Sequence, residues 1–136
     1  MIVGQGIDIV KVKRIEKILG KFESKFTTRI FSRKEIKFQN TIKKINDFNF
    51  AVKFASRFAA KEATVKALGT GFRNGIRFTD IEVFNEINGK PFINLLGKAK
   101  SVIENLQTKN KKLKVDLSMS NEKEYAIAIV TISLID

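Results

Sequence analysis

The chain has 136 residues, which fits one domain over residues 1–136, and its formal charge of +12 favours anionic partners such as nucleic acid, anionic lipid, phosphorylated cofactors or acidic proteins. It contains no Cys and no His, which excludes disulfides, the usual zinc sites, a thiol nucleophile and an imidazole base. Any metal site must therefore use oxygen ligands, and these favour magnesium, manganese or calcium.

The first half of the chain predicts one strand followed by helices. Residues 2–9 are rich in β-branched side chains and predict a strand. Residues 11–20 carry apolar side chains at helical spacing and end at a glycine that predicts a helix C-cap, and residues 22–30 follow as a short helix or turn. Ser32 and Glu35 match a capping box, which predicts the start of another helix.

The clearest helix is predicted over residues 47–68. Phe50, Phe54 and Phe58 recur every four residues and should face the core. A second row of small side chains should let another element approach closely; it consists of Ala51, Ala55, Ala59, Ala63 and Ala67. The helix is expected to end at the glycines that follow residue 68.

The second half of the chain predicts mostly strands. Residues 80–84 and 92–96 are expected to form two strands around an Asn-Gly turn. An amphipathic helix over residues 97–109 and strands over residues 113–119 and 125–134 complete the chain. This order predicts an α+β fold: a single domain with a mostly antiparallel sheet packed against a long central helix and shorter helices.

Two carboxylates are candidates for chemistry. Asp8 lies near the end of the first strand, where it could also be a solvent-facing residue or a cap for the next helix. Glu62 continues the phenylalanine row of the long helix, where a carboxylate is costly unless it is paired or bound to a cation. A salt bridge from Glu62 to Lys66, one turn further on, is also compatible with the helix pattern.

Basic residues and glycines on and after the same helix could hold phosphate. Lys53, Arg57 and Lys61 form a row at spacing four, which fits either a solvated face or a phosphate-binding edge. Gly69-Thr-Gly71 fits either a helix stop or a loop against a phosphate.

Several blocks of the sequence have a family's residues at the family's spacing. They are Gly6-Ile-Asp8-Ile-Val with Arg14, Phe31-Ser-Arg-Lys-Glu35, Arg57-Phe-Ala-Ala-Lys61-Glu62-Ala, Lys66-Ala-Leu-Gly69-Thr-Gly71, Asp80-Ile-Glu-Val83, Gly89-Lys-Pro91, Ser118-Met-Ser120-Asn121 and Tyr125-Ala-Ile-Ala128. Together they resemble the holo-acyl-carrier-protein synthases, the short bacterial branch of the 4'-phosphopantetheinyl transferases. The Phe-Ala-Ala-Lys-Glu-Ala block with its Gly-Thr-Gly loop is the most specific part of the match.

The resemblance implies an enzyme of fatty acid biosynthesis that transfers 4'-phosphopantetheine from coenzyme A to a serine of an apo acyl carrier protein and releases 3',5'-ADP. It implies Asp8 and Glu62 as ligands of Mg²⁺ or Mn²⁺ and assigns catalysis to Asp8, Glu62 and Lys66. The implied cofactor-binding residues are Arg57, Lys61, Lys66, Gly69, Thr70, Gly71, Lys90, Pro91, Ser120 and Asn121. Arg14 matches the surface that docks the acidic carrier protein, and Lys17 and Lys21 extend that surface. The family also implies a homotrimer with sites at subunit boundaries.

One position departs from the family's pattern. Asn121 stands where the family usually has His, and an amide cannot titrate near neutral pH. A metal-bound water or Glu62 is therefore expected to accept the serine proton.

Two other functions compete with the transferase. A basic nucleic-acid-binding protein would explain the charge, but no recognition motif is complete. A non-catalytic relative with the same fold would explain Asn121, but both Asp8 and Glu62 are present. The N-terminal residues do not resemble a signal peptide and no stretch is long enough to span a membrane, so a cytoplasmic location is predicted.

Overall fold

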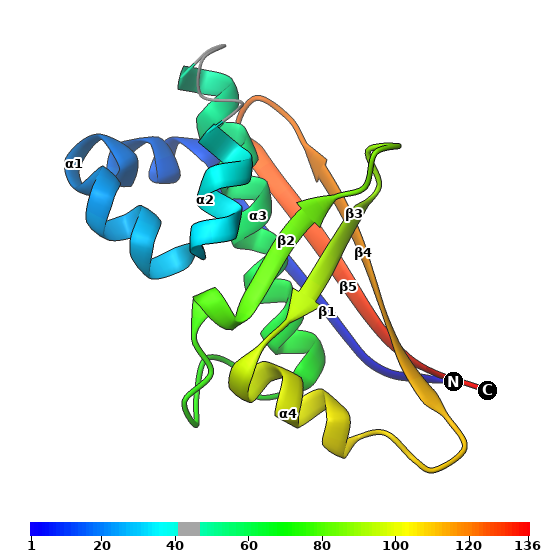
Figure 1. Cartoon of the computed structure of the whole chain (residues 1–136). Coiled ribbons are helices and arrows are strands. Elements are labelled where there is room, and N and C mark those ends of the chain that lie inside the picture. Colours follow the sequence, from blue (N-terminus) through cyan, green and yellow to red (C-terminus); the bar gives the residue numbers. More distant parts are fainter. Residues whose placement is uncertain (41–46) are drawn as a thin grey trace.

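The structure is a computed structural model that describes residues 1–40 and 47–136 (Figure 1). In chain order its elements are β1 (Ile2–Lys11), α1 (Val12–Ile30), α2 (Arg33–Asn40), α3 (Asp47–Leu68), the 3₁₀ helix η1 (Phe78–Asp80), β2 (Ile81–Asn85), β3 (Pro91–Leu95), α4 (Gly97–Asn105), β4 (Lys112–Asn121) and β5 (Tyr125–Ile135). Helices pack against antiparallel strands, so the predicted α+β class is confirmed.

The strands form two sheets rather than the single sheet predicted. The larger has the order β1-β5-β4, with β5 in the centre and every pair antiparallel. Side chains alternate along β5, and those facing α3 are buried: Ala126, Ala128, Val130, Ile132 and Leu134. The smaller sheet is the hairpin β2–β3. The N-terminal amino group donates to the carbonyl oxygen of Leu134 (2.8 Å), and the two ends of the chain lie side by side in Figure 1.

Helix α3 is the centre of the fold, and β1 lies directly against it. The predicted row of small residues is buried along its whole length (Ala51, Ala55, Ala59, Ala63 and Ala67). A Cβ atom on Gly6 would lie 2.0 Å from the carbonyl oxygen of Ala63, and one on Gly4 would lie 2.1 Å from that of Ala67. The close approach predicted for the alanine row is therefore confirmed, and glycine in β1 makes it possible.

The phenylalanine row of α3 passes from the core to its margin. Phe54 is 1% exposed and its ring lies 4.3 Å from that of Phe31, centroid to centroid. Phe58 is only partly buried and stacks on Phe78, with 5.6 Å between centroids. Burying each such side chain contributes about 1.5–3 kcal/mol. The next position of this row is Glu62, so its carboxylate lies at the edge of the core.

The structure corrects several predicted boundaries. The break predicted after Gly20 lies at Phe22, whose φ and ψ are −135° and 33°, and α1 continues beyond it to Ile30, so the helical alternative for residues 22–30 is confirmed. Helix α4 ends at Asn105, four residues before the prediction, because the segment that follows is polar and exposed. Asp80 belongs to η1 rather than to a strand, because its carboxylate accepts a hydrogen bond from the amide of Arg77 (2.9 Å).

The predicted capping box of α2 is confirmed. The amide of Ser32 donates to Glu35 Oε1 (3.1 Å), and the amide of Glu35 donates to Ser32 Oγ (3.2 Å). Within residues 1–40 and 47–136, no helix is both long enough and apolar enough to cross a membrane.

Candidate active site

Asp8 reaches α3 because of its place in the alternation of β1. Gly6 and Val10 face the helix, so Asp8, between them, faces it as well. Its side chain is 17% exposed, and its Oδ1 atom lies 3.0 Å from Lys66 Nζ. Lys66 also donates to the carbonyl oxygen of Ile7 (2.9 Å). The structure thus brings two of the three predicted catalytic residues together.

Glu62 lies beside this pair on α3. It forms no ion pair with any residue in the described part of the chain, so the alternative of a salt bridge to Lys66 is wrong: Lys66 binds Asp8 instead. Burial raises the pKa of Glu62 and the negative charge of Asp8 raises it further, while Lys66 and Arg14 lower it. Glu62 therefore lies within electrostatic range of Asp8, Lys66 and Arg14.

The two carboxylates fit a magnesium ion. No group of three or more acidic residues suited to a metal occurs among the residues that the structure describes. Mg²⁺ does not require one, because it usually takes one or two carboxylates, several waters and substrate phosphates. Asp8 on β1 lies close enough to Glu62 on α3 for its charge to raise the pKa of Glu62, and among the described residues Asp8 has an ion-pair partner while Glu62 has none. Oxygen donors of this kind and number suit a hard cation that is shared with a phosphate.

A separate pocket of about 410 Å³ contains other predicted site residues. It is lined by Phe38, Lys53, Ser56, Arg57, Asn85, Gly89, Pro91, Met119 and Asn121. Arg57 is 4% exposed and donates from Nη2 to Asn85 Oδ1 (2.7 Å). Its buried Nε has no hydrogen-bond partner among the described residues. Burial lowers the pKa of Arg57, and the charge of Glu35 opposes that shift. A guanidinium group in the wall of the pocket, with Lys53 beside it, favours an anionic ligand there.

The end of β4 sends its two predicted residues to opposite faces of the sheet. Asn121 lies in the pocket, where its Nδ2 donates to Ser56 Oγ (3.4 Å). Ser120 is paired with Ile127 and is exposed on the outer face. In the single chain Ser120 therefore does not reach the Arg57 pocket. The predicted Asn-Gly turn is confirmed by Gly89, which has a φ of 88°. Just after this turn, Lys90 is exposed and Pro91 lines the pocket.

The Gly-Thr-Gly segment ends α3, as one of its two interpretations predicted. The amide of Gly69 donates to the carbonyl oxygen of Lys66 (3.1 Å), and the amides of Thr70 and Gly71 donate to that of Val65 (3.2 Å each). Both glycines have positive φ, 73° and 61°, which favours glycine at these positions. All three amides therefore cap the helix, and Thr70 Oγ1 is buried without a hydrogen-bond partner in the described part of the chain.

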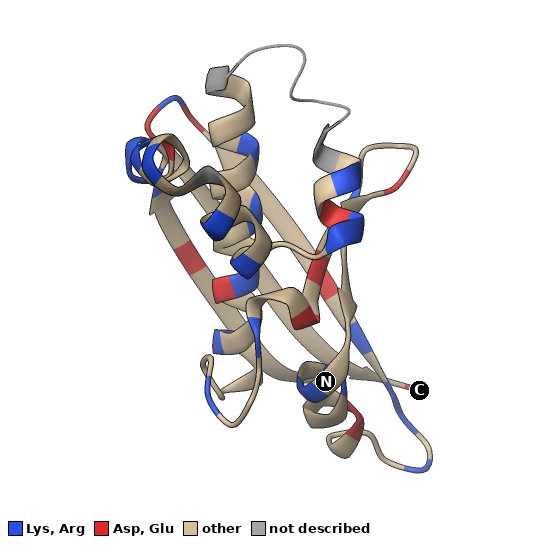
Figure 2. Ribbon diagram, turned by 60° about the vertical axis from the view of Figure 1, so that its left-hand side comes forward, with Lys and Arg blue, Asp and Glu red and all other residues tan. Residues whose placement is uncertain are grey.

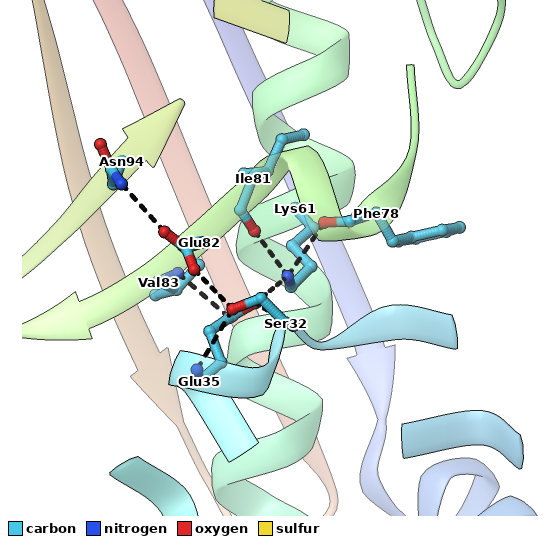
Figure 3. Close-up of polar contacts among 8 residues, drawn as sticks. All are labelled: Ser32, Glu35, Lys61, Phe78, Ile81, Glu82, Val83 and Asn94. Atoms are coloured by element: carbon cyan, nitrogen blue, oxygen red, sulfur yellow. Dashed lines mark hydrogen bonds and ion pairs between the residues drawn. The ribbon is translucent and has the colours of Figure 1, made fainter. Parts of the chain in front are cut away.

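Lys61 does not belong to a phosphate-binding edge. It is 0% exposed, and its ammonium group donates to Glu35 Oε1 (2.7 Å) and to the carbonyl oxygens of Phe78 and Ile81 (Figure 3). These bonds use all three of its protons. The predicted role of Lys61 in holding cofactor phosphate does not fit this position, because α2 and β2 cover the side chain.

A basic surface on α1 begins next to the carboxylates. A pocket of about 460 Å³ there is lined by Lys11, Lys13, Arg14, Lys17, Ile18, Lys21 and Phe22. All three predicted docking residues are among them, and Figure 2 shows Lys and Arg gathered on this helix. Phe22 is 56% exposed, so the cations surround an apolar patch.

Some residues of the site escaped the sequence prediction. Asn85 binds Arg57 and Ser56 binds Asn121, yet neither residue belongs to a helical row or motif that the sequence singled out. Glu82 is 2% exposed and is bound to Ser32, although only its place in a family block singled it out. Helical or strand spacing contains no signal for contacts between distant elements.

Comparison with known proteins identifies the family of this chain. A family model described as the 4'-phosphopantetheinyl transferase superfamily matches residues 4–130. The chain therefore belongs to the 4'-phosphopantetheinyl transferase superfamily.

Its relatives identify the branch. The chain is 47% identical over 133 residues to the holo-[acyl-carrier-protein] synthase of Ehrlichia chaffeensis, covering 97% of each protein. It is 44% identical over 133 residues to that of Zymomonas mobilis, covering 97% of this chain and 96% of the relative. Within the superfamily the chain thus belongs with the holo-[acyl-carrier-protein] synthases, and the resemblance found in its sequence is confirmed.

Solved structures of this family share the fold. One is the crystal structure of the Bacillus anthracis holo-(acyl-carrier-protein) synthase in complex with CoA (3',5'-ADP), with a TM-score of 0.75, 39% identity and coverage of 97% of this chain and 96% of that one. Another is the Helicobacter pylori synthase in complex with coenzyme A, with a TM-score of 0.73, 32% identity and coverage of 95% and 99%.

Proposed function

We propose that this chain is a magnesium-dependent holo-[acyl-carrier-protein] synthase, which moves 4'-phosphopantetheine from coenzyme A to a serine of apo acyl carrier protein in fatty acid biosynthesis. The observation that carries the proposal is the convergence of Asp8, Glu62 and Lys66 in a member of this family. Support also comes from the relatives solved with coenzyme A or 3',5'-ADP.

In the proposed reaction the serine oxygen of the carrier attacks the β-phosphorus of coenzyme A. A phosphorus–oxygen bond forms to the serine, and the bond to the departing oxygen of 3',5'-ADP breaks. Asp8 and Glu62 would hold Mg²⁺ or Mn²⁺, which supplies Lewis-acid stabilisation of phosphate charge when it is bound. Lys66 adds a fixed positive charge at the same place. The chain need not supply a nucleophile.

A base must accept the proton of the attacking serine. Because Asn121 replaces the family's usual His, the side chain at that position cannot accept it near neutral pH. Glu62 is the candidate within this chain, because it is a half-buried carboxylate beside Asp8 and Lys66 and forms no ion pair among the described residues.

The nucleotide end of coenzyme A is proposed to lie in the Arg57 pocket. Arg57 offers a buried donor without a partner in the described residues, and Lys53 adds a second positive charge. Phosphate is the anion that this donor set suits. Pro91 and Asn121, which line the pocket, would flank the ligand. Thr70 lies outside this lining, and its contact with the cofactor stays a prediction.

We further propose that the active site is completed between copies of the chain in a homotrimer. The carboxylate cluster and the Arg57 pocket have no lining residue in common. The outer face of the larger sheet is apolar and exposed, with cross-strand pairs Ile7–Ile129 and Ile9–Ile127 beside Asp8. Ile7 and Ile9 are 54% and 62% exposed, which is typical of a surface that is covered by another chain.

The basic surface of α1 is the proposed docking site for the acidic carrier protein. Arg14 lies close enough to Glu62 to lower its pKa, so a carrier bound on α1 would present its serine beside the carboxylates. Lys17 and Lys21 would steer the encounter by long-range attraction. The single domain over residues 1–136 and the cytoplasmic location stay predictions.

The decisive experiment is mass spectrometry of apo acyl carrier protein incubated with this protein, coenzyme A and magnesium. We expect a mass increase of one phosphopantetheine group, which is lost with Asp8→Ala or without a divalent metal. Asp116→Ala is the matched control, because Asp116 also lies on a strand of the larger sheet with a lysine 3.0 Å away. No increase with several carriers, from a folded protein, would favour the non-catalytic relative instead.

A further inference from the structure

A second charged cluster lies in the interior, outside the chemistry proposed above. It consists of Glu35, Lys61 and Glu82. The side chains of Glu35 and Lys61 are 0% exposed and their charged atoms are 2.7 Å apart, while Glu82 is 2% exposed. Figure 3 shows the ammonium group of Lys61 between α2 and the start of β2. Every proton of that group has an acceptor within the protein.

The acidic residues of this cluster join α2 to the β2–β3 hairpin. Glu35 accepts hydrogen bonds from the amides of Ser32 and Val83, each at 3.1 Å. Glu82 accepts one from the hydroxyl group of Ser32 and another from the side-chain amide of Asn94 (2.9 Å). Together with Lys61, these contacts link α2, α3, β2 and β3 at one point.

This ion pair is a costly way to hold elements together. Burial raises the pKa of Glu35 and lowers that of Lys61, and each partner's charge opposes the shift of the other. A packed apolar pair of similar volume is often as stable or more so. Unlike an apolar pair, the charged pair is directional. Hydrogen bonds from one ammonium group to separate elements fix the positions of those elements relative to α3.

The elements held by this cluster also form the walls of the Arg57 pocket. Arg57 lies one turn before Lys61 on α3, and its guanidinium group binds Asn85 at the end of β2 (2.7 Å). The guanidinium carbon of Arg57 lies 5.8 Å from the ring centroid of Phe38 on α2. Asn85 in turn donates to the carbonyl oxygen of Gly89 in the hairpin turn (3.0 Å). A shift of α2 or of the hairpin would therefore move the groups around Arg57.

We propose that Glu35 and Lys61 are positioning residues for the nucleotide end of coenzyme A. Their buried contacts hold α2 and the β2–β3 hairpin on α3 in the arrangement in which the Arg57 pocket accepts the ligand. This inference rests on the proposed function, because it takes the Arg57 pocket as the nucleotide site. Neither side chain contacts the ligand, so the effect passes through Arg57 and its neighbours.

The test measures 3',5'-ADP binding by titration calorimetry, together with KM for coenzyme A and for the carrier, in Lys61→Met and Glu35→Gln. Circular dichroism first establishes a temperature at which each variant is folded. We expect both to bind 3',5'-ADP roughly tenfold more weakly, with a matching rise in KM for coenzyme A and little change in KM for the carrier. Lys100→Met, which removes the exposed cation of a surface pair on α4, should keep wild-type values.

The double variant E35Q/K61M separates positioning from stability. It should regain most of the thermal stability that the single variants lose, because no buried charge is left unpaired. Its affinity for 3',5'-ADP should stay below that of the wild type, and it decides the question if a single variant does not fold. Wild-type affinity in the folded variants would overturn the positioning role and leave the proposed function intact. Absence of 3',5'-ADP binding by the wild-type chain would overturn both.

Discussion

Lys61 and Glu62 are neighbours on α3, yet their charges meet opposite environments. Their side chains point about 100° apart around the helix. Lys61 is 0% exposed and its protons are all bound by the acceptors of α2, η1 and β2. Glu62 is half-buried, lies near a second carboxylate and forms no ion pair within the part of the chain described.

The contrast separates two uses of charge in one helix. Where every proton of an ammonium group is bound within the protein, as in Lys61, the charge fixes the arrangement of the surrounding elements and has no proton left for a ligand. Where burial and a like charge both raise a carboxyl pKa, as at Glu62, the group gains from a cation that the protein itself does not provide. Sites of the second kind are the better candidates for chemistry.

The largest expected effect is on turnover, when the charge of Glu62 is removed. Glu62→Gln should lower turnover at saturating magnesium by roughly 10²–10³-fold, because a metal ligand and a proton acceptor are lost together. Its stability to urea should be unchanged or slightly higher, because burial disfavours the charged form that is removed. Turnover is measured by carrier modification and stability by denaturant unfolding.

Lys61→Met should have the opposite effect on turnover and stability: a large loss of stability with little loss of turnover. It leaves Glu35 buried without its cation, which typically costs about 3–5 kcal/mol of stability. Turnover of its folded fraction at saturating coenzyme A should stay near that of the wild type. If Glu62→Gln keeps near-normal turnover, or if it loses as much stability as Lys61→Met, the distinction between the two environments is wrong.

A smaller effect is expected on the surface, where charges act at a distance. Lys17→Glu with Lys21→Glu should lower kcat/KM for the carrier protein roughly tenfold at low salt, because like charges then oppose the encounter. KM for coenzyme A should not change. The wild-type rate should fall with added salt, since exposed charges are screened, and the double variant should lose most of that dependence.

The matched control for this surface is Lys109→Glu with Lys112→Glu. It makes the same change in net charge on two exposed residues, one in the segment after α4 and one at the start of β4, at the other end of the molecule from α1 (Figure 1). An equal loss of carrier turnover in this control would show that total charge, rather than the surface of α1, steers the carrier.

The sequence predicted most of this fold because its local signals agree. The capping box at Ser32 and Glu35, the Ala row of α3 and the Asn-Gly turn each depend on residues close together in the chain, and the structure confirms all three. These inferences need only the pattern of one element at a time. The position of Asp8 needed more: the strand pattern left it as a residue that could face solvent or cap the next helix, and the structure places it on the face of Gly6, against α3.

The burial of individual side chains could not be predicted, because it depends on contacts with elements that are distant in the sequence. Lys53, Arg57 and Lys61 share one helical row, but the first is exposed, the second is 4% exposed and the third is 0% exposed. α2 and β2 cover the end of the row, and no spacing within α3 contains that information. Similarly, the interruption of α1 falls at Phe22 rather than at Gly20, although glycine is the stronger local signal.

The smallest expected effect concerns Asn121, where the Arg57 pocket differs from the family's usual pattern. Asn121→His places a group with an ordinary pKa of about 6.5 next to Arg57 and Lys53. If phosphate binds there, the protonated ring adds attraction, so KM for coenzyme A should be a few-fold lower below that pKa and should rise to the wild-type value as pH increases through it. The measurement is KM for coenzyme A between pH 5.5 and 8 in both proteins, roughly the range over which a histidine titrates.

Asn121→Gln, which cannot titrate, serves as the control and should show no added pH dependence. A flat profile for Asn121→His would place the phosphate away from Asn121, and the residue would then belong to the structural wall of the pocket together with Ser56, its hydrogen-bond partner.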